Sequence, residues 1–364
     1  MIKVGSDFSG VGAFNQALMR LGIQYDEVFA CDMDKFARET FIHNYGEPKY
    51  YPKDVYEREI PKESLDIYMT SPPCQAFSLA GKRLGKDDKR GVLFFNSHEF
   101  IKKNKPRYFI FENVKGLLSD DNGNTFKEWI NMLGGKSVNG LPVLFAYEDS
   151  VPYHIYYKVM NAKKHGVPQN RERVFIIGIR GDADNHFRWA KEEHLNKRLK
   201  DVLEEEVNEK YILSNKKLKN IEIHNFIKIG TWRTHLDGNG FREIQDGNCP
   251  TIPARAREDG SGQPVIQVTQ LNKSKESGGV QPYQQNRVYD LNGINPALNA
   301  GQETWGGNII NTQQIRRLTP RECFRLMDFP ENFTWICKDS QAYKQAGNSI
   351  VVRCLELIIK QFNL

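Results

Sequence analysis

Short apolar runs alternate with amphipathic stretches along the first half of the chain. The apolar runs predict buried strands at Ile2–Asp7, Glu27–Cys31, Asp66–Thr70, Tyr108–Phe111 and Arg173–Ile179. Between several of these runs the spacing of apolar residues predicts helices, as at Phe14–Leu21 and Lys35–His43. This alternation is typical of α/β proteins, so residues 1–180 are expected to form a largely parallel, doubly wound sheet.

The pattern changes in the second half of the chain. Residues 183–222 are charged and helix-prone, which indicates a connector or a surface helix. Residues 223–312 are rich in Gly, Asn, Gln and Pro and contain short strand-like pieces such as Val265–Val268, which favours a separate, loop-rich module. The tail at 342–364 returns to a helical pattern. We therefore expect a large domain at 1–222, a small domain at 223–330 and a segment at 331–364 that returns to the large domain.

Composition narrows the classes of partner and compartment. The 364-residue chain has a formal net charge of +6, which suits a polyanionic partner without requiring one. The chain has no run of about eighteen apolar residues and no signal-peptide pattern, so we expect no membrane span. None of the 6 cysteines has the spacing of metal ligands, so no zinc site is expected. Reduced thiols and a cytoplasmic location fit this pattern.

One cysteine stands directly after a predicted strand. Ser71-Pro72-Pro73-Cys74 follows Asp66–Thr70, and its two consecutive prolines end the strand abruptly and stiffen the turn. Open α/β sheets place their chemistry at such strand ends. A cysteine is more often a small buried apolar residue than a nucleophile, so Cys74 alone leaves both interpretations open.

Further polar residues fall at the same edge of the predicted sheet. Glu112 follows Tyr108–Phe111, and a carboxyl in an apolar cleft can hold a proton. Arg171 and Arg173 stand at the start of the strand at 174–179, and we expect only one of them to face a site. Taken singly, these are ordinary surface or ion-paired residues. Together with Cys74 they favour an active site.

A glycine-containing turn joins the first predicted strand to the first predicted helix. Glycines in Phe8-Ser9-Gly10-Val11-Gly12 let the backbone approach a ligand closely. Asp32 ends the second predicted strand, where a carboxylate can accept hydrogen bonds from ribose hydroxyls. The full GxGxxG pattern is absent, so a plain glycine turn beside a surface aspartate explains these residues equally well.

In this order and over nearly the whole chain, these segments resemble the cytosine-C5 DNA methyltransferases, which are mostly bacterial and phage enzymes of restriction-modification type. Three later segments extend the resemblance: Lys53-Asp54-Val55, Arg317–Cys323 with Leu326–Pro330, and Gly347-Asn348-Ser349. Two departures stand out. Ser6 occupies a position that is usually acidic in the family, with Asp7 directly before Phe8, and Met33 stands where an aromatic residue is common.

The resemblance implies an α/β, Rossmann-like fold that binds S-adenosylmethionine, with a smaller loop-rich target-recognition domain. Asp32 would hold the ribose, Met33 would pack on adenine and Asp54 would lie near the adenine amino group. The implied cofactor-binding residues are Phe8, Gly10, Gly12, Asp32, Met33, Asp54 and Asn348. The implied catalytic residues are Cys74 as nucleophile, Glu112 as the cytosine-binding carboxyl, and the pair Arg171 and Arg173, with Arg173 preferred beside the base.

The resemblance also implies how the chain would bind DNA. Residues 79–92 are rich in glycine, lysine and arginine, and would form a mobile catalytic loop whose basic groups contact phosphates. Residues 223–312 would read base edges, because Gln, Asn and Arg dominate there. The implied DNA-binding residues are Ser78, Lys82, Arg83, Thr251, Arg255 and Arg257.

The function implied is that of a site-specific DNA (cytosine-5-)-methyltransferase that flips its target base and forms a covalent cysteine adduct. We also expect a role in restriction-modification or phage protection. The expected partners are double-stranded DNA and a cognate restriction endonuclease, and the expected oligomeric state is a monomer. Two alternatives stay open. A tRNA cytosine-C5 methyltransferase is disfavoured by the roughly ninety-residue module at 223–312. A catalytically silent DNA-binding regulator is disfavoured by the intact set Cys74, Glu112 and Arg173.

Overall fold

The computed structural model describes residues 1–73, 92–183, 185–211 and 318–364, together with the backbone of short strands between 229 and 317. Seven residues with expected roles lie outside the described residues: Cys74, Ser78, Lys82, Arg83, Thr251, Arg255 and Arg257. The chain forms two compact units. One comprises Met1–Lys197, Pro296–Glu303 and Cys323–Leu364, and the other comprises Arg198–Asn295 and Thr304–Glu322. The three-part division expected from composition stays a prediction.

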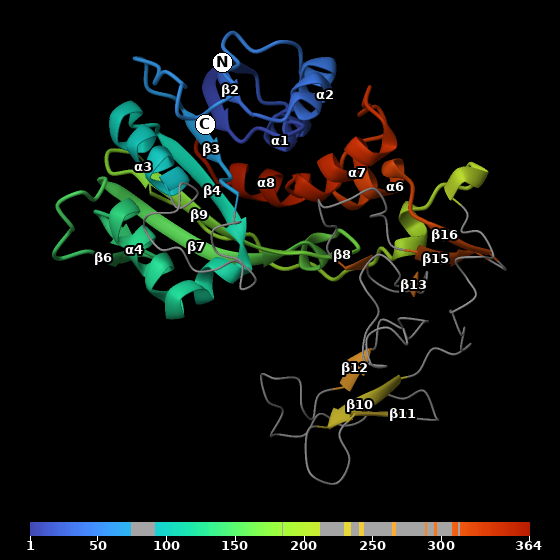
Figure 1. The fold of residues 1–364 in the computed structure, drawn as a ribbon. Helices are drawn as coiled ribbons and strands as arrows, with labels where there is room; N and C mark the ends of the chain where they lie inside the picture. Colours follow the sequence, from blue (N-terminus) through green and yellow to red (C-terminus); the bar gives the residue numbers. More distant parts are fainter. Residues whose placement is uncertain are drawn as a thin grey trace. The chain divides into compact units, whose positions relative to one another are not determined.

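The first unit is built on an eight-stranded sheet with the order β2-β1-β3-β4-β9-β7-β5-β6 (Figure 1). Its strands are β1 (Ile2–Asp7), β2 (Tyr25–Cys31), β3 (Ile67–Thr70), β4 (Tyr108–Val114), β5 (Ser137–Val138), β6 (Leu141–Pro142), β7 (Tyr153–Asn161) and β9 (Glu172–Arg180). Strands β2, β1, β3 and β4 pair in parallel, whereas β9 is antiparallel to both β4 and β7. The α/β class is confirmed, and the expected parallel pairing holds for those four strands within a mixed sheet.

The parallel pairing aligns the carboxyl ends of three central strands. Asp7 at the end of β1 pairs with Thr70 at the end of β3, and Thr70 pairs with Phe111 of β4. The glycine turn follows β1, the turn that leads to Cys74 follows β3, and Glu112 is the residue after Phe111 within β4. The sheet therefore gathers those segments at one edge, as open α/β sheets do.

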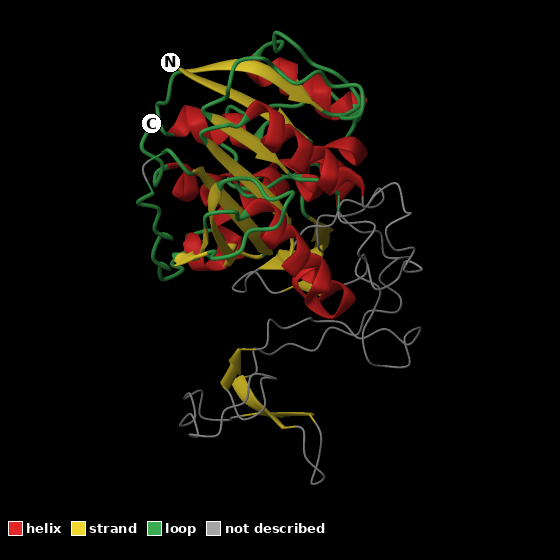
Figure 2. Ribbon diagram, turned by 90° about the vertical axis from the view of Figure 1, so that its left-hand side faces the viewer, coloured by secondary structure: helices red, strands yellow, loops and turns green. Residues whose placement is uncertain are grey.

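Helices lie on both sides of the sheet (Figure 2). They are α1 (Ala13–Arg20), α2 (Lys35–Tyr45), α3 (Val92–Asn104), α4 (Asn124–Leu133), α6 (Pro320–Leu326), α7 (Asp339–Asn348) and α8 (Val352–Ile359). Helix α2 begins at Asp34, whose side chain accepts hydrogen bonds from the backbone N–H groups of Phe36 and Ala37. Helix α8, near the end of the chain, packs against α1. The C-terminal tail therefore forms helices, as its pattern predicts.

Of the two alternatives expected for 183–222, the described residues 185–211 form the connector, with short 3₁₀ turns at Leu199–Val202 and Glu209–Tyr211, and not the surface helix. Strand β7 was not predicted, although alternate residues such as Tyr153 and Ile155 are buried. The remaining strands have the bounds β8 (Gln169–Asn170), β10 (Ile229–Arg233), β11 (Gly240–Glu243), β12 (Pro264–Ile266), β13 (Val288–Tyr289), β14 (Asn295–Pro296), β15 (Asn308–Asn311) and β16 (Gln314–Arg317).

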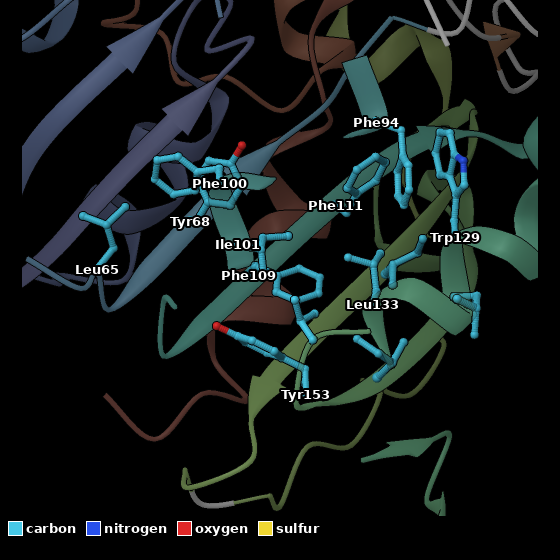
Figure 3. Packing of buried hydrophobic residues seen from close by; sticks show 14 of the residues in the cluster. Leu65, Tyr68, Phe94, Phe100, Ile101, Phe109, Phe111, Trp129, Leu133 and Tyr153 are labelled. Atoms are coloured by element: carbon cyan, nitrogen blue, oxygen red, sulfur yellow. The ribbon is translucent and has the colours of Figure 1, made fainter. Parts of the chain in front are cut away.

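Aromatic side chains from α3 and α4 fill the core on one face of the sheet (Figure 3). Phe94 stacks on Trp129 with 4.1 Å between ring centroids, and Tyr68 stacks on Phe100 at the same separation. Gly178 of β9 is required by this packing, because a Cβ there would lie 2.0 Å from the ring of Phe109. This dense core fixes β3 and β4, and with them the edge at which the polar segments lie.

One carboxyl in this unit is poorly solvated. The amide of Asn15 donates to Oε2 of Glu27 in β2, while Oε1 is shielded from solvent and has no hydrogen-bond partner among the described residues. Burial raises the pKa of Glu27 to about 8. The folded protein therefore holds this proton more tightly than the unfolded chain, so Glu27 lowers stability progressively as pH rises from its unfolded pKa near 4.5 towards 8.

We expect Glu27→Gln to stabilise the protein at neutral pH. A glutamine resembles the protonated carboxyl, so the gain should be near zero at pH 4.5 and on the order of 3 kcal/mol at pH 7. Thermal unfolding of both proteins across this pH range measures the difference. A gain that does not change with pH would contradict the shifted pKa.

Candidate functional site

The turn after β1 has a backbone that glycine makes possible. Phe8, Gly10 and Gly12 all have positive φ, at 57°, 55° and 82°. A Cβ on Gly12 would also lie 2.2 Å from the ring of Tyr45, so this glycine permits the close packing of α1. Among the described residues, none has an atom within 4 Å of a Cβ placed on Gly10. The space beside Gly10 is therefore open to a ligand.

The carboxyl of Asp32 is fixed beside this turn. The backbone N–H of Gly10 donates to Oδ2 at 2.8 Å, and that of Asp34 donates to Oδ1 at 2.8 Å. Burial raises the pKa of Asp32, and the two backbone hydrogen bonds oppose this shift. The side chain remains partly exposed. Each oxygen keeps a lone pair for a further donor, so the carboxyl is oriented to accept two hydroxyl groups.

The segment that carries Asp54 runs beside the end of β2. The backbone N–H of Asp32 donates to the carbonyl of Pro52 at 3.4 Å, and Oδ1 of Asp54 accepts from the N–H of Tyr56 at 2.9 Å. Two large apolar side chains are exposed on these segments, Met33 at 84% and Tyr56 at 53%. Tyr56 was not predicted from the sequence, and its aromatic side chain two residues after Asp54 was the available signal. The segments offer apolar surface and carboxylates together.

The last predicted cofactor residue lies on α7. Asn348 is exposed at the C-terminal end of this helix. Nζ of Lys344 lies 2.6 Å from Oδ2 of Asp34, and Thr40 donates to Gln345 at 3.1 Å. These two contacts hold α7 against α2, the helix that begins just after Asp32.

The turn that leads to Cys74 is held between β1 and β4. The hydroxyl of Ser71 donates to the carbonyl of Phe8 at 3.5 Å, and the side-chain amide of Asn113 donates to the carbonyl of Pro72 at 3.2 Å. Cys74 itself lies outside the described residues. The chain nevertheless enters Cys74 from a point that contacts both the glycine turn and the residue after Glu112.

Glu112 and Arg173 form a buried ion pair on neighbouring strands. Nε of Arg173 lies 3.1 Å from Oε1 of Glu112, and the two side chains are 20% and 11% exposed. Burial raises the pKa of Glu112, and the positive charges of Arg173 and Arg171 oppose the shift. A carboxyl with a raised pKa retains its proton at higher pH than usual, so Glu112 is suited to donate a hydrogen bond.

The two arginines have different surroundings. Residues two apart on a regular strand share a face, but Arg171 lies between β8 and β9, and the two guanidiniums bind different partners. Its guanidinium donates to the carbonyls of Gly347 and Ser349, each at 2.8 Å. Burial lowers the pKa of Arg171 to about 9. Arg171 therefore joins the sheet to the break between α7 and α8.

Comparison with known proteins accounts for this arrangement. The sequence model of the family described as C-5 cytosine-specific DNA methylase matches residues 2–363. The chain belongs to this family. It is a DNA (cytosine-5-)-methyltransferase, and S-adenosylmethionine is its methyl donor. The fold and the family expected from the sequence are thereby confirmed.

Relatives of known type match this methyltransferase over most of its length. The chain is 32% identical to the orphan methyltransferase M.SPRI of Bacillus phage SPR, covering 99% of this chain and 97% of the relative. It is 33% identical to the type II methyltransferase M.HpaII of Haemophilus parainfluenzae, with 96% and 86% covered. It is 32% identical to the type II methyltransferase M.HhaI of Haemophilus parahaemolyticus, covering 96% of this chain and 91% of the relative.

Solved structures share the fold. The Dnmt2 methyltransferase of S. pombe has a TM-score of 0.61 at 16% identity, with 99% of this chain and 97% of that chain covered. A putative DNA modification methyltransferase encoded within an E. coli prophage has a TM-score of 0.60 at 20% identity, with 99% and 98% covered. In the described part of the methyltransferase, no helix is long and apolar enough to cross a membrane.

The described residues fit S-adenosylmethionine chemically. The open space beside Gly10 admits a ligand against the backbone, and the oriented carboxyl of Asp32 can accept from a diol. Met33 and Tyr56 expose apolar surface suited to a flat aromatic ring. The methyltransferase therefore has acceptors and apolar surface of the kind that a nucleoside requires, at the carboxyl ends of β1 and β2.

We expect Asp32→Ala to weaken S-adenosylmethionine binding by about 1–3 kcal/mol, the scale of a hydrogen bond to a charged group. Binding of DNA in the absence of cofactor should hardly change. Isothermal titration calorimetry measures both affinities. Unaltered cofactor affinity in this variant would move the ribose site elsewhere.

Proposed function

We propose that this chain is a site-specific DNA methyltransferase that methylates C5 of a flipped-out cytosine through a covalent adduct with Cys74. The hydrogen bond from Asn113 to the carbonyl of Pro72 supports this most directly. It ties the turn that leads into Cys74 to the strand that carries Glu112. A thiol, a proton-holding carboxyl and a guanidinium are thus supplied from neighbouring strand ends, which is the set that this chemistry requires.

In this proposal, Cys74 activates the target cytosine for methylation. C5 of cytosine is a poor nucleophile, but addition of the Cys74 thiolate to C6 gives C5 carbanion character. S-adenosylmethionine, when bound, supplies an electrophilic methyl group that C5 attacks. A base then removes the C5 proton, and the electron pair of that C–H bond forms the C5–C6 double bond as the Cys74 thiolate leaves. The product is 5-methylcytosine and the thiol side chain is regenerated.

Glu112 and Arg173 stabilise the charge that develops on the ring. Protonated Glu112 hydrogen-bonds ring N3, so that addition at C6 does not leave an uncompensated anion. Arg173, which lies 3.1 Å from Glu112, is placed to contact the base oxygen and to favour the thiolate form of Cys74. Arg171 acts differently in this scheme, because its guanidinium is committed to Gly347 and Ser349 and it positions the segment that carries Asn348.

The cofactor is held by the carboxyl ends of β1 and β2. Asp32 accepts from the ribose hydroxyls, Met33 packs on adenine, and Asp54 lies near the adenine amino group. Phe8, Gly10 and Gly12 form the turn that admits the methionine part, and Asn348 approaches from α7. The oriented carboxyl of Asp32 is the strongest support for this placement.

Duplex DNA is the substrate best supported by family and relatives. C5 and C6 are stacked inside a duplex, so the target base must be flipped out to reach Cys74. Ser78, Lys82 and Arg83 contact the DNA backbone in this proposal. Thr251, Arg255 and Arg257 belong to the target-recognition module at 223–312.

The biological setting follows from the relatives, which are type II and phage orphan methyltransferases. We place this enzyme in a restriction-modification or phage protection role, acting as a monomer in the cytoplasm and, in the former role, beside a cognate endonuclease. A tRNA methyltransferase is the second candidate. The likeness to Dnmt2 at 16% identity concerns the fold alone.

Transfer of labelled methyl groups to duplex DNA and to tRNA separates the two substrates. We expect incorporation into DNA only, at one sequence motif that bisulfite sequencing of DNA from expressing cells will define. Incorporation into tRNA with unmethylated DNA would replace the proposal with its alternative.

Arg255 and Arg257 test the base-reading role of the module. If each makes a bidentate contact to guanine, Arg255→Ala and Arg257→Ala should relax the methylated motif, with a loss of about 1–3 kcal/mol of discrimination. Bisulfite maps of each variant reveal the motif. An unchanged motif at lower occupancy would show that the two arginines bind phosphate instead.

A further inference from the structure

A buried ion pair lies directly beneath the proposed cofactor site. Nε of Arg58 lies 2.9 Å from Oδ1 of Asp7, and the two side chains are 2% and 0% exposed. The hydroxyl of Tyr68 in β3 donates to Oδ2 of Asp7 at 2.6 Å. Asp7 is the last residue of β1, so this pair begins where the glycine turn begins.

Arg58 is also held by α3. Its Nη2 donates to Oδ1 of Asn96 at 2.8 Å, and its guanidinium carbon lies 4.5 Å from the centroid of the Phe100 ring. The amide of Asn96 in turn donates to the carbonyl of Val55 at 3.0 Å. The segment 54–58 is therefore tied to the protein interior near both of its ends, through Val55 and through Arg58.

The carboxylate of this pair and the hydroxyl of the preceding residue have different surroundings. The buried hydroxyl of Ser6 has no hydrogen-bond partner among the described residues. Neighbouring residues on a strand point to opposite faces, so an acid at Asp7 instead of Ser6 is directed at the other face of the sheet. On that face Arg58 and Tyr68 contact Asp7, and Asn96 contacts Arg58.

Stability alone does not explain this arrangement. Removing two charges from water costs several kcal/mol for each ion, and replacing a buried ion pair by apolar residues is often neutral or stabilising. A buried pair can instead fix one arrangement of the chain among several, because its hydrogen-bond geometry is directional. Here the fixed arrangement is that of the segment which carries Asp54 and Tyr56.

We propose that Asp7, Arg58 and Asn96 form a positioning network that holds the segment 54–58 against the end of β1 and thereby sets the affinity for S-adenosylmethionine. The inference rests on the proposed adenine contacts of Asp54. None of the three residues touches the cofactor. They act through the backbone of Val55 and through the position of Arg58, and the order they impose exists before the cofactor binds.

Two variants remove the network without stranding a carboxylate. The double variant Asp7→Asn/Arg58→Met removes both charges together, and Asn96→Ala removes both tethers made by α3. Tyr68→Phe is the matched control, since it deletes a donor to Asp7 but leaves the ties to the segment 54–58 intact. Calorimetry with S-adenosylhomocysteine measures affinity, and amide hydrogen exchange of the ligand-free protein measures the order of the segment.

We expect about tenfold weaker ligand binding, and about tenfold faster exchange of the Tyr56 and Glu57 amides, in the double variant and in Asn96→Ala. Tyr68→Phe should bind within about twofold of the parent protein even if its melting temperature falls. Parent-like exchange at Tyr56 and Glu57 in both network variants would overturn the inference. Asp54→Ala tests the proposed adenine site separately from the network. Unchanged affinity in that variant would refute the adenine site, while the exchange result still tests the network.

Discussion

Cys74→Ser is expected to lower the rate of methyl transfer to DNA by about a thousandfold or more, the scale seen when a covalent nucleophile is removed. A hydroxyl is almost entirely protonated at neutral pH and is a far weaker nucleophile than a thiolate, so addition to C6 fails. Affinity for S-adenosylhomocysteine should be unchanged, because the proposed cofactor contacts come from other segments. Single-turnover kinetics with labelled cofactor measures the rate.

Cys337→Ser provides a matched control for this substitution. Cys337 is a partly exposed free cysteine whose sulfur lies 3.4 Å from Nε2 of Gln345, and it is remote in sequence from the proposed chemistry. The control should retain the parent rate within about twofold. A Cys74→Ser enzyme that methylates near the parent rate would show that the nucleophile has been misassigned.

Glu112→Gln is expected to lower the rate by about 10²–10⁴-fold, the range for loss of a general acid. Glutamine keeps the shape, can still accept from Nε of Arg173 and can donate an amide N–H to ring N3, but it cannot transfer a proton to N3 as a carboxylic acid can. The pKa of Glu112 is raised by burial, so the parent enzyme should lose activity only when pH rises through that raised value and the proton leaves. The variant should lack this fall.

Glu172→Gln is the control on the neighbouring residue. Glu172 pairs with Lys115 at 3.0 Å on an exposed part of β9, and such pairs contribute little to stability. Its rate and pH profile should match those of the parent. A Glu112→Gln enzyme with parent activity across the pH range would remove Glu112 from the chemistry.

The sequence predicted those parts of the fold in which local pattern and burial agree. Strand β1 was predicted with the bounds observed, since its apolar residues Ile2 and Val4 alternate around Lys3 and a glycine turn follows directly. Strand β7 was not, because Tyr, His and Lys interrupt its apolar residues and its burial alternates only in part. For the charged residues 183–222 the sequence left a connector and a surface helix open, and the described part forms the connector, since helix propensity alone is a weak signal.

The sequence likewise predicted only part of the candidate site. Asp32 and Glu112 could be located from the strands that they end or extend. The preference for Arg173 over Arg171 came with the family resemblance and not from local pattern, because the carbonyls that bind Arg171 belong to Gly347 and Ser349, which lie 176 and 178 residues away in the chain. The pair Asp7–Arg58 spans 51 residues and carries no local signal. Such long-range polar contacts depend on how the elements pack.

The central claim is that Cys74 bonds covalently to C6 of the target cytosine. Duplex DNA with 5-fluorocytosine at the methylated position tests it, because after methyl transfer the fluorine cannot leave as a proton does and the adduct persists. With S-adenosylmethionine present, we expect a stable protein–DNA complex whose digested peptide, by mass spectrometry, carries the modified base on Cys74. Absence of that adduct, on DNA whose cytosine counterpart is methylated by the same enzyme, would contradict the account.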